Sequence, residues 1–331
     1  MTTLIEQGIN IPKIIYYYQT FCRLNSILYK NTPVTHIHLS SIHFGYNTDS
    51  KGHQIPYIHL NNNNPESHKF DDLWNQLSDA KAYGIKIILM VGGAGTAYQK
   101  LFADYETFYP LLKEIIELNR NIIDGIDLDI EEPTLLKNVK MLINDIDKDF
   151  GKDFIISMAP VQFTMENTNE PGMSGFKYIQ LYDSPEGKRI AYFNVQAYSS
   201  YTCASLDTIV KNGYPVEKIV MGMLTGQDYN NVKTEVSKMV QKYKSNFGGV
   251  FIWEYYDAPP SGITNPVDWA IDMQTIINKY KNSLIDTEAI INNIDKNINS
   301  LNQNISENYH YVKTHVKQIF YNFIYHKNEN K

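Results

Sequence analysis

Short segments rich in β-branched and aromatic residues recur along the chain, and most are separated by segments with helical apolar spacing. The strand candidates are residues 13–20, 35–44, 86–91, 122–130, 154–160, 190–198, 218–224 and 249–255, and the clearest helical segments are 70–83, 108–118, 135–146 and 232–243. Strands that alternate with helices imply a parallel sheet. Eight such repeats favour a closed barrel over an open doubly wound sheet. We therefore predict an α/β fold, a (β/α)₈ TIM barrel whose active site lies at the carboxyl ends of the strands.

Two parts of the chain depart from this repeat. The connection 45–69 is long for a barrel loop, and its segment 54–60 predicts a small hairpin beside a binding cleft. Past about residue 281, apolar residues such as Leu284, Ile291 and Ile298 follow a heptad-like spacing between Asn and Lys residues. We predict a barrel domain over residues 1–281 and an additional C-terminal tail, helical or coiled-coil, over 282–331. A helix packed on the barrel, a partly disordered tail and self-association through the tail remain alternatives.

Composition excludes several classes of function. The 331 residues carry 30 basic and 36 acidic side chains, a net charge of −6, which argues against a nucleic-acid binder. Cys22 and Cys203 are too few for a disulfide framework and are expected to be free thiols. No segment reaches the roughly 20 apolar residues of a membrane span, and the N-terminus has no signal-peptide pattern. We expect a cytoplasmic protein or one exported by an unmarked route.

A row of acidic residues ends the fourth strand candidate, within the segment 124–133. Side chains alternate along a strand, so Asp127, Asp129 and Glu131 share one face and the apolar residues between them face the helices. Neighbouring like charges raise the pKa of at least one carboxyl group, which suits a general acid. A divalent-cation site and a solvated acidic edge are the alternatives. The apolar flanks argue against the edge, and a hard-cation site normally draws ligands from several loops.

Three other features carry weaker signals. Residues 92–95 are glycine-rich but lack the patterns of phosphate-binding loops. His36 and His38 share a strand face without a third ligand at suitable spacing, so we expect core or cleft histidines and no metal site. Glu132 breaks the strand alternation and precedes Pro133, which favours a loop residue whose charge lies at a helix N-terminus.

The acidic segment, read as D-G-x-D-x-D-x-E from Asp124 to Glu131, resembles the signature of family 18 glycoside hydrolases, the chitinases and endo-β-N-acetylglucosaminidases. Many members have an aromatic residue before the Glu, where this chain has Ile130. The resemblance runs from about residue 13 to 280 and is strongest to the fungal endo-β-N-acetylglucosaminidase branch. Other segments that resemble family motifs are 15–20, 58–61, 90–93, 157–160, 194–198 and 248–254.

The resemblance implies a retaining endo-glycosidase that hydrolyses β-1,4 linkages of N-acetylglucosamine by substrate-assisted catalysis. By that resemblance Glu131 protonates the leaving oxygen, and the 2-acetamido oxygen of the substrate attacks the anomeric carbon. Asp129 orients the acetamide and stabilises the resulting cation, with Asp127 behind it as a charge partner. Tyr198 donates its hydroxyl to the acetamido oxygen.

Five further residues are candidates for substrate binding. The indole of Trp253 is expected to stack against the sugar that bears the acetamide. Gln196 alternates with Tyr198 on the inward face, and Gly93 ends the third-strand motif. Tyr16 and Tyr18 share one face of the first strand, which we expect to line the cleft. The partner is then a carbohydrate, and no cofactor is expected.

Two choices stay open at this point. The substrate is either chitin and its oligosaccharides or the chitobiose core of N-glycans. The alternative from another class is a non-catalytic, lectin-like barrel. Such relatives typically lose the acid at the position of Glu131, which this chain retains. A scaffold organised by the tail is a third and weaker hypothesis.

Overall fold

The computed structural model describes residues 10–279, 299, 302–303, 314–315 and 317 of the chain. The predicted helical tail, residues 282–331, otherwise lies outside the described residues, so its form and its self-association stay predictions. The barrel belongs to the first of two units, Met1–Asn278.

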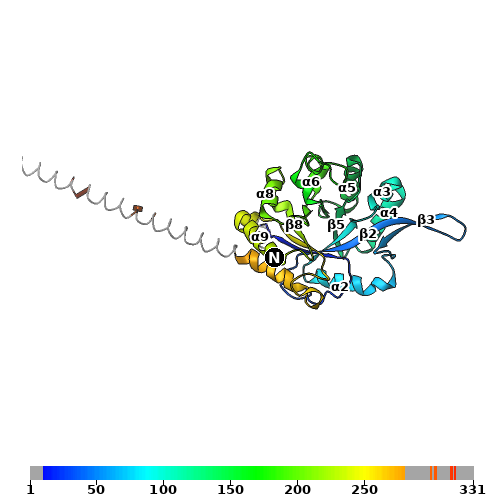
Figure 1. Cartoon of the computed structure of the whole chain (residues 1–331), viewed down its shortest axis with the longest axis horizontal. Coiled ribbons are helices and arrows are strands. Elements are labelled where there is room, and N and C mark those ends of the chain that lie inside the picture. Colours follow the sequence, from blue (N-terminus) through cyan, green and yellow to red (C-terminus); the bar gives the residue numbers. More distant parts are fainter. Residues whose placement is uncertain (1–9, 280–298, 300–301, 304–313, 316, 318–331) are drawn as a thin grey trace, which may run out of the picture. The chain divides into compact units, whose positions relative to one another are not determined.

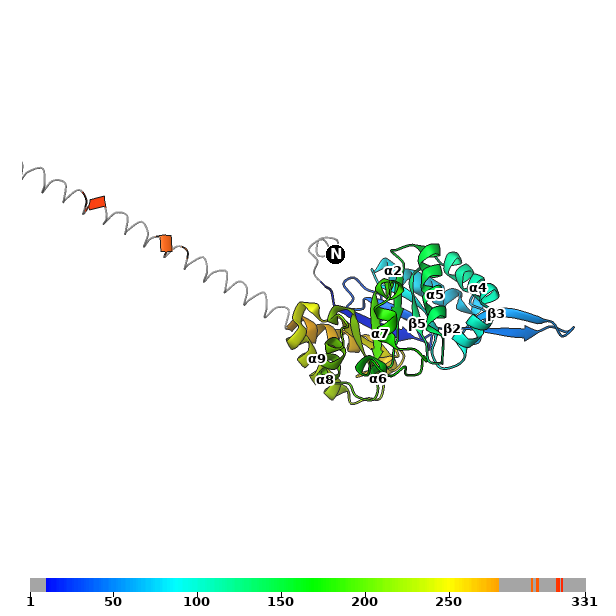
Figure 2. The same cartoon turned by 90° about the horizontal axis from the view of Figure 1, so that it is seen from above.

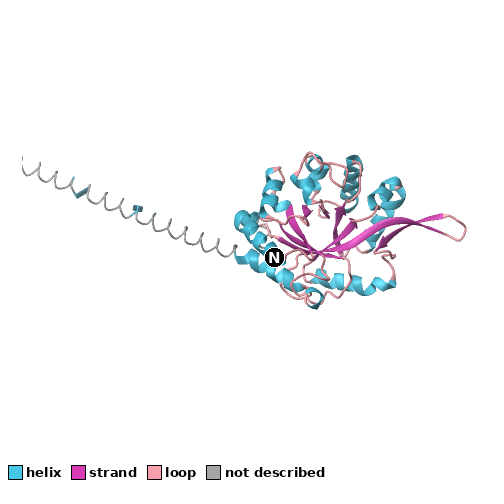
Figure 3. Cartoon of the chain, in the orientation of Figure 1, coloured by secondary structure: helices cyan, strands magenta, loops and turns pink. Residues whose placement is uncertain are grey.

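Eight parallel strands form a closed barrel, which confirms the predicted fold class (Figures 1 and 3). Hydrogen-bonded neighbours run in the order β1-β9-β8-β7-β6-β5-β4-β2, and pairing of β1 with β2 closes the ring. All eight strand candidates are found, most of them shortened at one or both ends. The barrel strands are β1 (Lys13–Tyr18), β2 (His36–Thr48), β4 (Lys86–Gly92), β5 (Ile123–Asp129), β6 (Ile155–Met158), β7 (Tyr192–Gln196), β8 (Ile219–Leu224) and β9 (Gly249–Trp253).

Helices surround the strands (Figure 3), and the residues on the apolar faces of the longer helices are buried. Residues 19–35, between β1 and β2, form turns and no helix. Among the described residues, no helix is both long enough and apolar enough to cross a bilayer. The α-helices are α2 (Asp71–Ala82), α3 (Ala97–Ala103), α4 (Tyr105–Leu118), α5 (Leu136–Phe150), α6 (Gln162–Glu166), α7 (Tyr178–Tyr182), α8 (Cys203–Lys211), α9 (Tyr229–Tyr243) and a further helix over residues 267–279.

Short 3₁₀ helices complete the connections. They are η1 (His68–Phe70), η2 (Glu186–Arg189), η3 (Val216–Lys218), η4 (Lys244–Asn246) and η5 (Gly262–Thr264).

The strand β3 (Gln54–Leu60) lies outside the barrel and pairs antiparallel with the second half of β2, from Ile42 to Thr48. The segment 54–60 is therefore one arm of a hairpin whose other arm is β2, rather than a small hairpin by itself. This β2–β3 hairpin projects beyond the ring of helices (Figure 2). Because β2 continues past the carboxyl end of the barrel, the hairpin stands beside the face where a TIM barrel carries its active site.

The barrel interior is filled by side chains, as in other TIM barrels. A cluster of buried side chains, each at most 2% exposed, lies inside it and includes Ile15, Tyr17, Met90, Tyr192 and Phe251. On β5, the apolar residues between the acids are also buried, on the side of the helices. The alternation expected for β5 is thus present, and it directs the acidic side chains inward.

Candidate active site

Three acidic side chains lie at successive heights along the inner face of β5 and the two residues that follow it. Asp127 is fully buried, Asp129 is 4% exposed and Glu131 is half-buried. We call the surroundings of Asp127 the floor of the site and the surroundings of Asp129 and Glu131 its mouth. The two regions differ in how their carboxyl groups are satisfied.

At the floor, four groups from four strands meet the carboxylate of Asp127. The Tyr17 hydroxyl donates to Oδ2 over 2.7 Å, and the Ser157 hydroxyl donates to Oδ1 over 2.6 Å. Asn194 Nδ2 donates to Oδ1 over 3.4 Å and to the Tyr17 hydroxyl over 3.0 Å. His38 Nδ1 lies 3.2 Å from Oδ2. Hydrogen bonding of this kind is what a buried carboxylate requires.

These contacts decide the charge of the floor. Burial by itself raises the pKa of Asp127, but His38, together with the hydroxyls of Ser157 and Tyr17, outweighs it and holds that pKa below its ordinary value. The second ring nitrogen of His38 lies 3.1 Å from the Tyr192 hydroxyl, so both imidazole nitrogens have polar neighbours. Asp127 is therefore ionised at neutral pH.

At the mouth, a single amide connects the two outer carboxyl groups. Gln196 Nε2 lies 3.1 Å from Asp129 Oδ1 and 3.2 Å from Glu131 Oε1, and 2.9 Å from the carbonyl oxygen of Ala159. One nitrogen has two hydrogens for these three acceptors. Asp129 and Glu131 consequently face the same space from the same side.

Like charges dominate around Asp129. Burial raises its pKa well above the ordinary value, and the carboxylates of Glu131, Asp127 and Glu132 raise it further, while the bond from Gln196 acts in the opposite direction. Asp129 therefore holds a proton at a pH where Asp127 has lost its own. Carboxyl groups at such short range titrate as a coupled set.

Two glycines let the chain pass closely over the end of β5. Gly92 has φ +100°, and a Cβ on it would lie 2.2 Å from the carbonyl oxygen of Asp129. Gly93 has φ +82° and donates its backbone N–H to that same oxygen over 2.9 Å. Both positions require glycine. The loop fixes the backbone of Asp129 from above and leaves Gly93 in the wall of the site.

A pocket of about 210 Å³ opens over these carboxyl groups. Trp253 and Leu224 form part of its wall at the ends of β9 and β8, and Tyr198 lines it just beyond β7. The Trp253 ring lies 5.5 Å from the ring of Tyr17, which also reaches the pocket. Burial and the charges of Asp129, Glu131 and Asp127 raise the pKa of Tyr198, so its hydroxyl stays protonated and can donate a hydrogen bond.

Glu132 points away from this pocket. Its Oε1 accepts the backbone N–H of Tyr98 over 2.6 Å, at the first turn of α3, and that of Gln99 over 3.4 Å. It is therefore a loop residue whose charge lies at a helix N-terminus, as expected, although the helix is α3 and not the one that follows it in sequence.

The substrate-binding roles expected for Tyr16 and Tyr18 are wrong. Both rings are fully buried on the outer side of β1, where Tyr16 donates to the carbonyl oxygen of Pro266 over 2.5 Å and Tyr18 donates to that of Cys22. The pocket contains Tyr17 instead. Three consecutive tyrosines give a strand two similar faces, so alternation alone does not reveal which face is inside.

Sequence reasoning also missed the polar partners of Asp127. Ser157 and Asn194 lay inside family-like segments, which was the available signal, but neither was assigned a role. His38 was expected to be a core or cleft residue, and it is buried next to Asp127. Within the part of the chain that the structure describes, no group of three or more His, Cys, Asp or Glu side chains is arranged to hold a metal ion.

The chain matches the model of a known protein family. The profile described as "Glycosyl hydrolases family 18" matches residues 13–237. The search of curated proteins gave no match.

Solved structures resemble the chain over the whole barrel. A fungal endo-beta-N-acetylglucosaminidase from glycosyl hydrolase family 18 is 30% identical, with a TM-score of 0.69, covering 80% of this chain and 98% of that one. The chitinase ChiC from Aspergillus fumigatus is also 30% identical, with a TM-score of 0.67 and coverages of 80% and 99%. A chitinase of the same family from Pseudoalteromonas aurantia, 20% identical with a TM-score of 0.60, shares the fold over 80% of this chain and 99% of its own.

Proposed function

Because this chain belongs to glycosyl hydrolase family 18 and is a glycoside hydrolase, we propose that it cleaves β-1,4 linkages of N-acetylglucosamine with retention of configuration. The substrate is either a chitooligosaccharide or the chitobiose core of an N-glycan. The proposal rests on the arrangement of the carboxyl groups at the mouth.

The observation that carries the proposal is the single amide between Asp129 and Glu131. Both carboxyl groups lie within 3.2 Å of Gln196 Nε2 and project from neighbouring positions of one chain segment. A retaining enzyme with its own nucleophile needs its two carboxyl groups on opposite sides of the scissile bond. Here they share one side, which supports a nucleophile supplied by the substrate, its 2-acetamido group.

In the first step, Glu131 donates its proton to the glycosidic oxygen as the bond from that oxygen to the anomeric carbon breaks. The acetamido carbonyl oxygen attacks the anomeric carbon and forms a cyclic oxazolinium ion. While Glu131 holds the proton that the coupled acids share, Asp129 is a carboxylate. It accepts the amide N–H and offsets the positive charge, and Tyr198 donates its hydroxyl to the acetamido oxygen. The ionised Asp127 below them keeps the local potential negative.

In the second step, Glu131 acts as a carboxylate. It removes a proton from water, whose oxygen attacks the anomeric carbon on the face that the leaving group occupied. The oxazolinium ring opens and restores the acetamide. Two inversions at one carbon give net retention. Trp253, in the wall of the pocket, offers an apolar face for the sugar that undergoes these steps.

The test uses two substrates in parallel. The protein is incubated with N-acetylchitohexaose and with a high-mannose glycoprotein, and the products are separated and weighed by mass spectrometry. Release of shorter chitooligosaccharides assigns the chitin-type activity. Loss of the glycan, with one N-acetylglucosamine left on the protein, assigns the N-glycan-type activity. A protein that leaves both substrates intact contradicts the proposal.

A further inference from the structure

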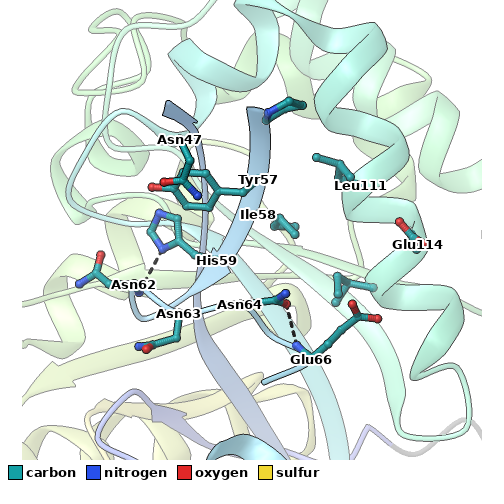
Figure 4. A pocket seen from close by; sticks show the side chains of 12 residues that line it. Asn47, Tyr57, Ile58, His59, Asn62, Asn63, Asn64, Glu66, Leu111 and Glu114 are labelled. Carbon is teal, nitrogen blue, oxygen red and sulfur yellow. Dashed lines mark hydrogen bonds between the residues drawn. The ribbon is translucent and has the colours of Figure 1, made fainter. Parts of the chain in front are cut away.

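A second pocket, of about 370 Å³, lies between the outer strand of the β2–β3 hairpin and helix α4 (Figure 4). One wall consists of β3 and the loop that follows it, and the other consists of Leu111, Glu114 and Ile115 of α4. Its volume is within the range of about 300–1,000 Å³ that is usual for small-molecule sites. None of its lining residues belongs to the active-site pocket.

A row of three rings crosses one face of the hairpin. Tyr57 and His59 are neighbours on β3, with ring centroids 5.3 Å apart, and His59 stacks on His43 of β2 at 5.5 Å and 16°. Gly45 lies opposite Tyr57, and a Cβ there would be 2.8 Å from the phenol ring. The missing side chain is what allows the Tyr57 ring to lie flat across β2.

Several hydrogen-bonding groups in the lining of this pocket are not used by the protein. Among the described residues, the side chains of Asn47, Asn62, Glu66 and Glu114 are exposed and have no hydrogen-bond partner. Figure 4 shows Asn47 beside Tyr57, and Glu114 across the pocket on α4. Amides both donate and accept, and carboxylates accept, so together they can satisfy a ligand whose groups do both.

The imidazole of His59 is a fixed neutral donor. Its Nδ1 accepts the backbone N–H of Asn62 over 3.1 Å, so the proton of the neutral ring is on Nε2. Burial, together with the smaller effects of the neighbouring His43 and Lys100, lowers the pKa of His59 to about 4. The ring is therefore uncharged near neutral pH and presents one N–H.

Direct contacts connect this pocket with the active site. Ala94 and Gly93 line the active-site pocket. The next residue, Gly95, lies against the His43 ring, since a Cβ on Gly95 would be 3.2 Å from its Nε2. His43 stacks on His59, which lines the second pocket. Contacts between this loop and the rings thus run from one pocket to the other.

The lining also excludes other classes of ligand. It contains no lysine or arginine, and it contains two glutamates, so phosphate and other anions are disfavoured. A peptide that adds a strand to the free edge of β3 would meet Pro56, which has no N–H to donate and is typical of protected edges. A ring face surrounded by amides and acceptors suits a neutral ligand rich in hydroxyl groups.

We propose that this second pocket binds a neutral oligosaccharide, so that a long glycan is held both there and in the active site. The part of this proposal in which one glycan occupies both pockets rests on the proposed function, because that glycan is then the substrate. The apolar face of one sugar lies on the rings of Tyr57 and His59, and its hydroxyl groups pair with Asn47 and Asn62. Glu114 accepts hydrogen bonds from a further sugar that lies between β3 and α4.

The test measures binding of an oligosaccharide to the second pocket in a protein that does not hydrolyse it. The protein carrying Glu131→Gln is titrated with N-acetylchitotriose and, separately, with a high-mannose oligosaccharide, while NMR follows the ring signals of His59. We expect saturable shifts with at least one sugar. A further Asn62→Ala or Tyr57→Ala substitution should raise the Kd by about tenfold, which corresponds to ~1.4 kcal/mol.

Matched controls separate binding from folding. Asn121→Ala and Tyr83→Ala change residues of the same types at exposed positions away from the pocket, and they should leave the Kd unchanged. If Tyr57→Ala does not fold, Asn62→Ala decides, because its side chain is exposed. The sugar that shifts the His59 signals shows whether the ligand is of the chitin type or of the mannose type.

Two results overturn the proposal. One is the absence of His59 shifts with both sugars. The other is a shift caused by an extended peptide and not by either sugar, which assigns the pocket to a protein partner. Neither result depends on hydrolysis, so each is distinguishable from a failure of the proposed enzyme activity.

Discussion

The floor and the mouth of the active site lie two residues apart on the same strand, yet they shift the pKa of a buried aspartate in opposite directions. At the floor, Asp127 has hydroxyl, amide and imidazole neighbours on four strands, and its pKa is below the ordinary value. At the mouth, Asp129 is buried among other carboxyl groups, receives one bond from Gln196, and its pKa is well above the ordinary value.

The difference shows that burial by itself does not decide the charge of a carboxyl group. Both aspartates are at most 4% exposed, so the number and kind of their partners make the distinction. At the floor, hydrogen bonds stabilise the charged form of Asp127 and so contribute to the stability of the fold. At the mouth, the closely spaced acids retain a proton, which can be transferred to a glycosidic oxygen.

The largest effect is expected for Glu131→Gln at the mouth. The amide cannot donate an acidic proton, so turnover should fall by about 10²- to 10⁴-fold. The substitution keeps the shape of the side chain and its place beside Gln196, and the thermal midpoint should change little. Initial rates with the cleaved substrate measure the first effect, and calorimetry measures the second. Undiminished turnover would remove Glu131 from the mechanism.

The next largest effect is expected for Asp129→Asn. Turnover should fall by about 10²-fold, because an amide does not offset the positive oxazolinium ion. The free energy of unfolding, in contrast, should increase at neutral pH. The folded-state pKa of Asp129 is raised, so this residue costs stability as pH rises from its unfolded pKa through its folded one. The variant should be more stable than the wild type at pH 7, by about 1 kcal/mol, and equally stable near pH 3.

Denaturant unfolding of both proteins at the two pH values measures this difference. A variant that is less stable at both pH values would contradict the assignment of like-charge crowding to the mouth. In that case Asp129 would be a satisfied residue similar to Asp127.

A smaller effect is expected at the floor, from Tyr17→Phe. The substitution removes one donor to the buried Asp127. Hydrogen bonds to charged groups contribute roughly 1.5–3 kcal/mol. The pKa of Asp127 is lowered in the fold, so its stabilisation is present above its unfolded pKa and is lost as pH falls through the folded pKa. Without Tyr17 the folded pKa rises, and acid unfolding should begin at a higher pH.

Tyr16→Phe is the matched control for this prediction. It removes a hydroxyl of the same strand that bonds to the carbonyl oxygen of Pro266, on the outer side of the barrel. This variant should lose about the same free energy of unfolding at every pH, whereas Tyr17→Phe should lose more at pH 7 than below the folded pKa of Asp127. Denaturant unfolding of both variants at several pH values compares the two. A loss that does not depend on pH in either variant would show that Tyr17 does not control the charge of Asp127.

Much of this arrangement could be predicted from the sequence, because it depends on local periodicity. The eight strands and the inward face of Asp127, Asp129 and Glu131 follow from the alternation of polar and apolar residues along short segments. The short helices α3, α6, α7 and α8 were not predicted. They have too few turns for a clear apolar period.

The floor could not be predicted in the same way. The partners of Asp127 contact it only because the barrel closes and sets the register between distant strands. These partners are Tyr17, His38, Ser157 and Asn194. No spacing along the chain encodes that meeting. Tyr16 and Tyr18 were assigned to the wrong face because their strand has aromatic side chains on both sides.

The central claim is that the acids at the mouth act from one side and that the substrate supplies the nucleophile. Proton NMR of the freshly released reducing end tests it most directly, recorded before the anomers equilibrate, on whichever glycan is cleaved. The account predicts that the β anomer appears first and the α anomer follows by mutarotation. An α anomer at the earliest time point would show direct attack by water and would contradict the account.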